Sequence, residues 1–306
     1  MIRQNVSLKE FSNYKIGGPA LYFLEASSKD ILVEDLKNWD KDLPAFILGN
    51  GTNILIGEKG FEGLVIHCTI PGVDKQDDKV IVGAGVLVSD LLNFCVENSL
   101  SGLEWAGGLP GSIGGAVRGN AGAFGGETKD LVLEVMSLDI KTLEEKKRNN
   151  KECEFGYRTS IFKTKAKDEI ILTVKLGLKK GDKEAIKKSI REKIDYRYKK
   201  HPMDRPSLGS TFKNIPVVIL TEQQKKDLMQ FVKNDPFPVI PVAKLLYLCN
   251  LKGKREGDAQ ISEKHPNFIV NLGNAKTDEV KNLIEFAKKA VKEKFNVTLE
   301  EEIMYL

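Results

Sequence analysis

The stretch GLEWAGGLPGSIGGAVRGNAGAFGGE, residues 102–127, is the most informative part of the sequence and contains ten of the 27 glycines of the chain. Glycine adopts positive φ angles and lets the backbone approach a ligand closely, and successive unblocked N–H groups bind phosphate oxygens. A flexible linker is the alternative, but it would expose the large apolar side chains of the stretch, Trp105, Leu109, Ile113, Val117 and Phe124. The stretch therefore predicts ordered loops that bind a large diphosphate ligand.

The two commonest nucleotide-binding motifs do not match this stretch. Its spacing is not a GxGxxG that opens a helix, and no acidic residue follows a clear strand–helix–strand unit. The chain also lacks the GxxxxGK[ST] motif of a P-loop. A second glycine-rich loop, GNGTN at 49–53, lies earlier in the chain, and Thr52, Ser112 and Asn120 add side chains that form hydrogen bonds. The two loops predict a diphosphate site on a different fold.

Composition excludes several classes of protein. The 306 residues are 41% hydrophobic, which is enough for a folded core, and the length corresponds to about two domains. A net charge of +4 is too small to indicate nucleic-acid binding, although it is compatible with an anionic ligand. No run approaches the roughly 18 apolar residues of a membrane helix, and the first residues do not form a signal peptide. A cytoplasmic protein that does not bind membranes is therefore expected.

The cysteines and histidines do not indicate a metal site. The four cysteines are far apart and form no CxxC, so reduced thiols are expected rather than zinc ligands or disulfides. The three histidines, His67, His201 and His265, are too scattered to predict a metal centre.

Apolar periodicity predicts an α+β fold in which strands dominate the first half. The expected strands are 45–48, 64–66, 80–82, 131–138, 170–178 and a closing strand at 297–305. The expected helices begin near Ser28, at Ser89, at Asp182, after the Thr221–Gln224 capping box, at Pro241 and at Thr277. Pro241 is expected to be the first helical residue of its helix. The proline-bearing stretch 201–206 is a plausible domain boundary.

Seven segments stand out along the chain: NYKIGGPA (13–20), ILGNGTNILI (47–56), the glycine-rich stretch 102–127, FGYRTSIFK (155–163), GSTFKN (209–214), KGKREGDAQISEKHPNFIVN (252–271) and LEEEI (299–303). In this order they resemble the motifs of the UDP-N-acetylenolpyruvoylglucosamine reductase family, flavoenzymes of bacterial peptidoglycan precursor synthesis. Each motif is weak by itself, but seven in order over nearly the whole chain are specific.

The resemblance implies a two-subdomain FAD-binding module of the vanillyl-alcohol-oxidase type, followed by an α+β substrate-binding domain. The implied boundaries are 1–72 and 73–198 for the FAD-binding subdomains and 199–295 for the substrate domain, with 296–306 returning to the active site. The residues that the resemblance assigns to FAD are Gly49, Asn50, Gly51, Thr52, Asn53, Gly108, Gly111, Ser112, Gly115, Asn120 and Gly122.

The resemblance also implies a reaction. NADPH reduces FAD, and the reduced flavin then reduces the enolpyruvyl group of UDP-N-acetylglucosamine-enolpyruvate to UDP-N-acetylmuramate. Ser210 in GSTFKN matches the proton donor, while Arg158 in GYRTS and Glu302 in LEEEI match the residues that stabilise the enolate. The residues expected to contact the substrate are Tyr157, Lys213, Asn214 and His265.

The chain departs from the family pattern in several places. Glu301 replaces the usual proline before Glu302, and the segment 215–240 is longer than usual. A tyrosine-bearing insertion between the arginine and serine motifs is absent, which is typical of the shorter branch of the family. Without it, the substrate diphosphate needs other partners, for which Lys244, Lys264 and His265 are candidates. A monomer is expected.

Two other functions remain open from the sequence. A different flavin oxidoreductase on the same scaffold explains the glycine loops but not the coincidence of the Arg158, Ser210 and Glu302 motifs. A non-catalytic binder of flavin or nucleotide sugar is compatible with the altered C-terminus. A substrate screen of the reduced protein distinguishes another flavin oxidoreductase from the reductase that the resemblance implies. If Ser210→Ala has no measurable effect on the protein, the non-catalytic binder is favoured.

Overall fold

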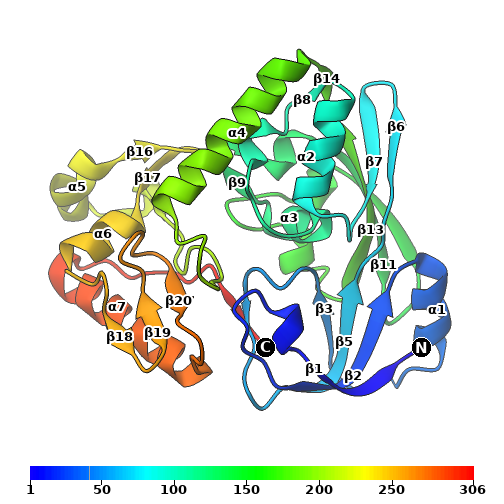
Figure 1. Ribbon diagram of the computed structural model, residues 1–306, viewed down its shortest axis with the longest axis horizontal. Helices are drawn as coiled ribbons and strands as arrows, with labels where there is room; N and C mark the ends of the chain where they lie inside the picture. The colour runs from blue at the N-terminus through cyan, green and yellow to red at the C-terminus, as the bar shows by residue number, and fades with distance from the viewer. Residues whose placement is uncertain (41) are drawn as a thin grey trace. The chain divides into compact units, whose positions relative to one another are not determined.

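The computed structural model describes residues 1–40 and 42–306, and the chain divides into two compact units. The first unit comprises Met1–Val6, Pro19–Gly51 and Phe61–Asp195, and the second comprises Ser7–Gly18, Thr52–Gly60 and Tyr196–Leu306. Strands and helices are mixed in both, which confirms the predicted α+β class (Figure 1). No helix within the described residues is long and apolar enough to cross a membrane.

A four-stranded sheet in the order β1-β2-β5-β3 begins the first unit (Figure 1). Its strands are β1 (Arg3–Ser7), β2 (Pro19–Ala26), β5 (Phe61–Cys68) and β3 (Ala45–Leu48). Both β2 and β3 run parallel to β5, which requires crossover connections, and helix α1 (Lys29–Lys37) provides the one after β2. The Ser28 hydroxyl caps α1 by accepting a hydrogen bond from the Ile31 N–H at 3.2 Å, as the sequence predicts.

A five-stranded antiparallel sheet forms the rest of the first unit, in the order β12-β11-β13-β7-β6. These strands are β12 (Glu145–Asn149), β11 (Val132–Asp139), β13 (Glu169–Gly177), β7 (Lys79–Gly83) and β6 (Val73–Gln76). The other α-helices of this unit are α2 (Val88–Glu97), α3 (Ile113–Gly119) and α4 (Lys183–Lys200), whose residues from Tyr196 onward belong to the second unit. Its other strands are β8 (Leu100–Ser101), β9 (Gly122–Ala123), β10 (Gly126–Glu127) and β14 (Lys179–Lys180). One apolar core joins the two sheets, and it includes Leu64 and Ile66 of β5 together with Val82 of β7.

The second unit packs short sheets against helices. One sheet has the order β15 (Ile215–Pro216), β17 (Pro238–Ile240) and β16 (Lys233–Asn234). Another has the order β18 (Arg255–Glu256), β19 (Ala259–Ile261) and β20 (Ile269–Asn271), and β21 (Met304–Tyr305) pairs with β4 (Ile54–Leu55). The helices of this unit are α5 (Glu222–Leu228), α6 (Val242–Leu248) and α7 (Thr277–Phe295). Helix α7 lies beside β18 and β19 and buries Leu283, Ile284, Ala287 and Val291 in the core of this unit (Figure 1).

Most predicted elements are confirmed, and two details are wrong. The Thr221–Gln224 capping box begins α5, and helices begin at or within one residue of Ser89, Asp182 and Thr277. Pro241 is the residue before α6 rather than its first helical residue. The closing strand is not continuous over 297–305, because only a bridge at Glu301 and the two residues of β21 pair, each with a different partner segment.

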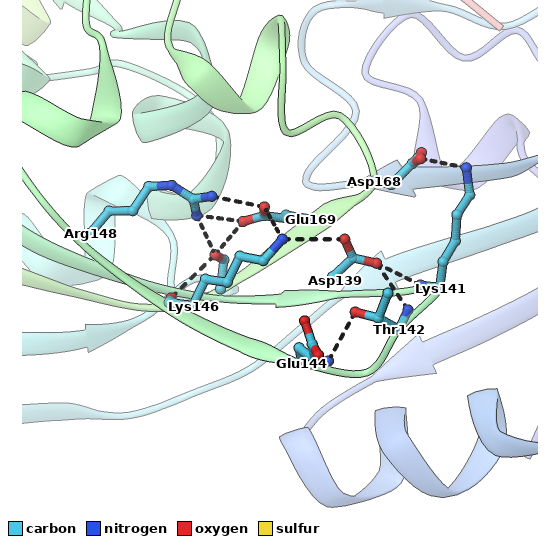
Figure 2. Close-up of polar contacts among 9 residues, drawn as sticks. Asp139, Lys141, Thr142, Glu144, Lys146, Arg148, Asp168 and Glu169 are labelled. Carbon is cyan, nitrogen blue, oxygen red and sulfur yellow. Dashed lines mark hydrogen bonds and ion pairs between the residues drawn. The ribbon is translucent and has the colours of Figure 1, made fainter.

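A buried ion-pair network stabilises one face of the five-stranded sheet (Figure 2). The Glu169 side chain is 4% exposed and accepts hydrogen bonds from both terminal nitrogens of Arg148, at 2.5 and 2.9 Å, and from the hydroxyl of Ser137 at 2.7 Å. Lys146 joins Glu169 to Asp139. Burial alone would raise the pKa of Glu169, but hydrogen bonds from Arg148, Ser137 and Lys146 outweigh it, so the pKa is lowered and the carboxylate is ionised.

Replacing Arg148 by methionine should destabilise the protein by about 3 kcal/mol, because it leaves a buried carboxylate without its bidentate partner. Chemical denaturation measures this difference. The stabilisation that comes from the lowered Glu169 pKa is present above the carboxyl titration range and is lost as pH falls through it. The difference in the free energy of unfolding between wild type and Arg148→Met should therefore become smaller at acidic pH. Lys141→Met, which removes an exposed pair with Asp168, is the control and should cost less than about 1 kcal/mol.

Candidate active site

The glycine-rich stretch 102–127 is an ordered part of the first unit. Ala106 and Val117 are completely buried, and α3 begins inside the stretch. A Cβ atom on Gly126 would lie 2.4 Å from the ring of Trp105, so glycine is the residue that fits there. The large apolar side chains pack in this unit, which excludes the flexible linker.

The two glycine-rich loops meet at the beginning of α3. Ser112 caps this helix by accepting a hydrogen bond from the Gly115 N–H at 3.4 Å. A Cβ atom on Gly49 would lie 2.8 Å from the Ser112 hydroxyl oxygen, so the end of β3 touches the cap. Among the described residues, the N–H groups of Asn50 and Gly51 make no hydrogen bond to another protein group. These closely approaching backbones, with N–H groups available, fit a diphosphate such as that of FAD.

Asn120 ends α3 and connects three parts of the first unit. It has a left-handed backbone, with φ 42°, and is completely buried. Its side-chain NH₂ donates to Glu127 Oε1 at 3.1 Å and to the Gly156 carbonyl at 2.9 Å, while its oxygen accepts from the Lys129 N–H at 3.0 Å. The Asn120 amide therefore holds the loop that leads to Arg158, besides lying in the stretch that the sequence assigns to FAD.

Arg158 follows that loop and turns back toward the glycine-rich stretch. Its backbone is left-handed, with φ 57°, and Nη2 donates to the Gly122 carbonyl at 2.9 Å. The guanidinium carbon lies 5.3 Å from the centre of the Tyr157 ring, and the Lys163 ammonium donates to the Arg158 carbonyl at 3.1 Å. The structure thus brings Arg158, Tyr157 and Gly122 together, and these contacts hold the guanidinium in one orientation.

Ser210 and Glu302 belong to the second unit, and main-chain hydrogen bonds bring their segments together. The Glu302 N–H donates to the Thr211 carbonyl at 2.8 Å, and the Lys213 N–H donates to the Glu300 carbonyl at 2.9 Å. Ser210 immediately precedes this antiparallel pairing and follows Gly209, whose φ of 76° turns the chain. Residues 211–213 and 300–302, which are far apart in the sequence, therefore pair with each other.

Asn267 clamps the segment after Ser210, a role that the sequence does not predict. Its carbonyl accepts from the Thr211 N–H at 2.7 Å, and its side-chain oxygen accepts from the Phe212 N–H at 3.0 Å. Its side-chain NH₂ donates to the Phe212 carbonyl at 2.8 Å, and the residue is 3% exposed. The only sequence signal for Asn267 is its place in the motif 252–271, because Phe212 lies 55 positions away.

Asn53, which the sequence assigns to FAD, contacts the Glu302 segment. Its side-chain NH₂ donates to the Glu302 carbonyl at 3.0 Å, and its own carbonyl accepts from the Met304 N–H at 3.0 Å. The parallel pairing of β21 with β4 continues from this point. Asn53 thus binds the Glu302 carbonyl, while Thr211 accepts from the Glu302 N–H.

The predicted substrate contacts of the second unit have protein partners of their own. Lys213 forms an ion pair with Glu300, and the Asn214 side-chain oxygen accepts from the Val242 N–H at 3.1 Å, at the beginning of α6. The rings of His265, His201 and Phe268 form a cluster in which each pair of ring centres is 5.0 Å apart.

The electrostatics of this cluster keep its imidazoles neutral. Burial and the nearby ammonium groups of Lys252 and Lys233 lower the pKa of His265 to about 4. Burial, with His265 and Arg197, also lowers the pKa of His201 to about 4. At neutral pH both rings are therefore uncharged, and cationic lysines supply the positive potential around them.

Three of the cysteines are buried thiols of the first unit. They are Cys68, Cys95 and Cys153, and burial raises the pKa of each thiol, so all three stay protonated at neutral pH. No group of three or more histidine, cysteine, aspartate or glutamate side chains within residues 1–40 and 42–306 is arranged to hold a metal ion.

Comparisons with known proteins match both units. Residues 201–306 match the model described as UDP-N-acetylenolpyruvoylglucosamine reductase, C-terminal domain, and residues 21–141 match the model of an FAD binding domain. A UDP-N-acetylenolpyruvoylglucosamine reductase of Caldanaerobacter subterraneus subsp. tengcongensis is 39% identical over 98% of this chain and 91% of its own. One from Clostridium tetani is 35% identical over 100% of this chain and 92% of its own.

A solved structure extends the match to the fold. The UDP-N-acetylenolpyruvylglucosamine reductase of Thermus caldophilus is similar with a TM-score of 0.78 and 31% identity, over 100% of this chain and 99% of that chain. The sequence and structural matches cover the glycine-rich loops together with the Ser210 and Glu302 segments. This chain therefore belongs to the UDP-N-acetylenolpyruvoylglucosamine reductase family and is an FAD-dependent oxidoreductase.

Proposed function

We propose that this protein reduces the enolpyruvyl group of UDP-N-acetylglucosamine-enolpyruvate to give UDP-N-acetylmuramate for peptidoglycan synthesis, with NADPH as electron donor. The observation that carries the proposal is the ladder of the second unit, which pairs the segment after Ser210 with the segment of Glu302. The resemblance assigns these two residues to one reaction, and their segments are neighbours despite their distance in the sequence. The protein is proposed to act as a cytoplasmic monomer.

The glycine-rich loops are proposed to hold FAD. Gly49, Asn50 and Gly51 lie beside the Ser112 cap of α3, where backbone N–H groups can receive phosphate oxygens. The other proposed FAD contacts are Thr52, Asn53, Gly108, Gly111, Gly115, Asn120 and Gly122. When bound, FAD supplies the hydride that the reaction needs. Residues 1–72 and 73–198 are the proposed FAD-binding subdomains, and 199–295 the proposed substrate domain.

Ser210 is proposed to donate the proton that completes the reduction. A serine hydroxyl is a weak acid, but a carbanion next to a carboxylate is strongly basic, so placement matters more than acidity. The left-handed turn at Gly209 and the clamp of Asn267 give the residue a defined backbone position. These contacts support a role that depends on geometry.

Arg158 and Glu302 are proposed to stabilise the negative charge that develops on the substrate carboxylate. A guanidinium presents several N–H donors in one plane, which matches a carboxylate, and its bond to the Gly122 carbonyl fixes that plane. A glutamic acid beside the same carboxylate can donate a hydrogen bond if it is protonated. Tyr157 packs on Arg158 and is proposed to contact the substrate as well.

The substrate diphosphate is proposed to bind the basic and aromatic side chains of the second unit. Lys244, Lys264 and His265 are the candidates, while Lys213 and Asn214 are proposed to contact other polar groups of the substrate. A neutral imidazole at His265 can donate one hydrogen bond to a phosphate oxygen, and Lys252 and Lys233 add positive potential. The Lys244 ammonium also lies 5.2 Å from the centre of the Phe231 ring, so this region combines cations with apolar surface.

The purified protein should be yellow, should be bleached by NADPH without oxygen, and should regain its colour when the enolpyruvyl UDP-sugar is added. Anaerobic absorption spectroscopy follows both steps. UDP-N-acetylglucosamine, which lacks the enolpyruvyl group, is the control and should not restore the colour. Bleaching by NADPH with no response to the enolpyruvyl substrate would contradict the proposed reaction while leaving the flavoprotein assignment in place.

Ser210→Ala should slow substrate reduction by roughly 10²- to 10⁴-fold, because it removes the proposed proton donor. Reduction of the flavin by NADPH should keep its wild-type rate, and stopped-flow absorption measures the two steps separately. Ser89→Ala changes an exposed serine on α2 and is the matched control. Equal turnover by Ser210→Ala and wild type would remove the assigned role.

Asn267→Ala should lower the turnover and also the stability of the second unit. It leaves the Phe212 N–H and carbonyl without their buried partner, which costs about 1–3 kcal/mol. Thermal unfolding and turnover are measured together on the same preparation. Asn274→Ala, at an exposed position, is the control. A variant that loses stability but retains the full rate of substrate reduction would show that the clamp does not position Ser210.

A further inference from the structure

The segment that carries Glu302 is held by main-chain hydrogen bonds to two different segments. Residues 300–302 pair with 211–213 through the two bonds described above. Further along, the Met304 N–H donates to the Asn53 carbonyl and the Leu306 N–H donates to the Leu55 carbonyl, each at 3.0 Å. The partner changes at Glu302, so neither ladder alone determines how this residue is oriented.

Glu301 supplies a side-chain contact at this change of partner. One of its carboxylate oxygens lies 2.5 Å from the Lys288 ammonium on α7, and the other accepts a hydrogen bond from the Tyr305 hydroxyl. The Glu301 side chain is 19% exposed, so it is largely removed from water. Lys288 also pairs with Glu285 at 2.6 Å, one turn earlier on α7. The C-terminal segment is thereby attached to a helix.

Helix α7 is a rigid support for this attachment. It has 19 residues, and Ile284, Ala287 and Val291 are buried in the core of the second unit. Burial lowers the pKa of Lys288, but its hydrogen bonds to Glu285 and Glu301 outweigh this effect and raise it, so the ammonium is charged. Burial and the hydrogen bond to Glu301 raise the pKa of Tyr305, so its hydroxyl keeps the proton that it donates.

The attachment also distinguishes the adjacent carboxylates. Glu301 uses one carboxylate oxygen toward Lys288 and the other toward Tyr305. Glu300 pairs with Lys213. Both neighbouring carboxylates are thus engaged by other side chains, and the family motif assigns the proposed catalytic role to Glu302.

We propose that Lys288 and Glu301 are positioning residues, which set the orientation of Glu302 by attaching its segment to α7. This inference rests on the proposed function, since it assigns a purpose to the orientation of Glu302. It also explains how this chain holds the residue without the proline that the family pattern has before it. A proline restricts the backbone at this position, whereas Glu301 forms an ion pair with Lys288 and accepts a hydrogen bond from Tyr305.

Lys288→Met should lower the rate of substrate reduction between roughly ten- and a hundredfold, because small displacements of a catalytic group have effects of that size. The KM for the enolpyruvyl substrate and the rate of flavin reduction by NADPH should change little. Lys289→Met is the matched control, since Lys289 lies next to Lys288 on α7, is 76% exposed, and approaches Glu293 only at 3.9 Å. Tyr305→Phe removes one hydrogen bond and should give a smaller loss of the same kind.

Two further measurements separate positioning from general stability. Hydrogen exchange of the peptide 300–306 should become faster in Lys288→Met, while exchange in the core of α7 stays unchanged. In a Glu302→Gln background, the Lys288→Met change should cause no additional loss of rate. An equal loss in both backgrounds, or unchanged exchange at 300–306, would overturn the positioning role. An unaffected rate in Glu302→Gln alone would instead count against the proposed function of Glu302.

Discussion

Pairing of the C-terminal segment with residues 211–213 and 53–55 is the constraint on which the candidate site of the second unit depends. Backbone N–H and carbonyl groups of a folded segment pair wherever water is excluded, and here successive residues of one short segment pair with two different neighbours. This brings Glu302 next to the segment that follows Ser210. A residue near the end of the chain can therefore act in a site whose other parts come from distant motifs.

The first unit uses glycine for a related reason. Where α3 begins, the loop after β3 touches the Ser112 cap so closely that a side chain on Gly49 would collide with it. Backbone groups, rather than side chains, then face the place where a diphosphate is expected. Asn120 adds a buried amide that ties α3 to the loop of Arg158. The loops proposed to hold the cofactor and the loop that carries Arg158 are consequently connected through Asn120.

Charged residues have different purposes in different parts of the molecule. Glu169 and Arg148 form a buried pair on the five-stranded sheet, and we expect this pair to contribute to stability (Figure 2). Lys288 and Glu301 are also paired, but next to a proposed catalytic residue. In the cluster around His265, burial and lysines keep the imidazole neutral. Electrostatic contacts alone therefore do not identify the active residues.

The α+β class, most helices, the caps at Ser28 and Thr221 and the motifs that reveal the family follow from the sequence, because periodicity, capping residues and glycine-rich loops are local properties. The sequence also named Arg158, Ser210 and Glu302, through motifs and not through geometry. It did not predict the clamp of Asn267, the bond from Asn53 to Glu302 or the attachment of Glu301 to α7. Their partners lie 55, 249 and 13 positions away in the chain. Only tertiary structure decided these contacts, because a hydrogen bond or ion pair depends on which atoms folding brings within about 3 Å.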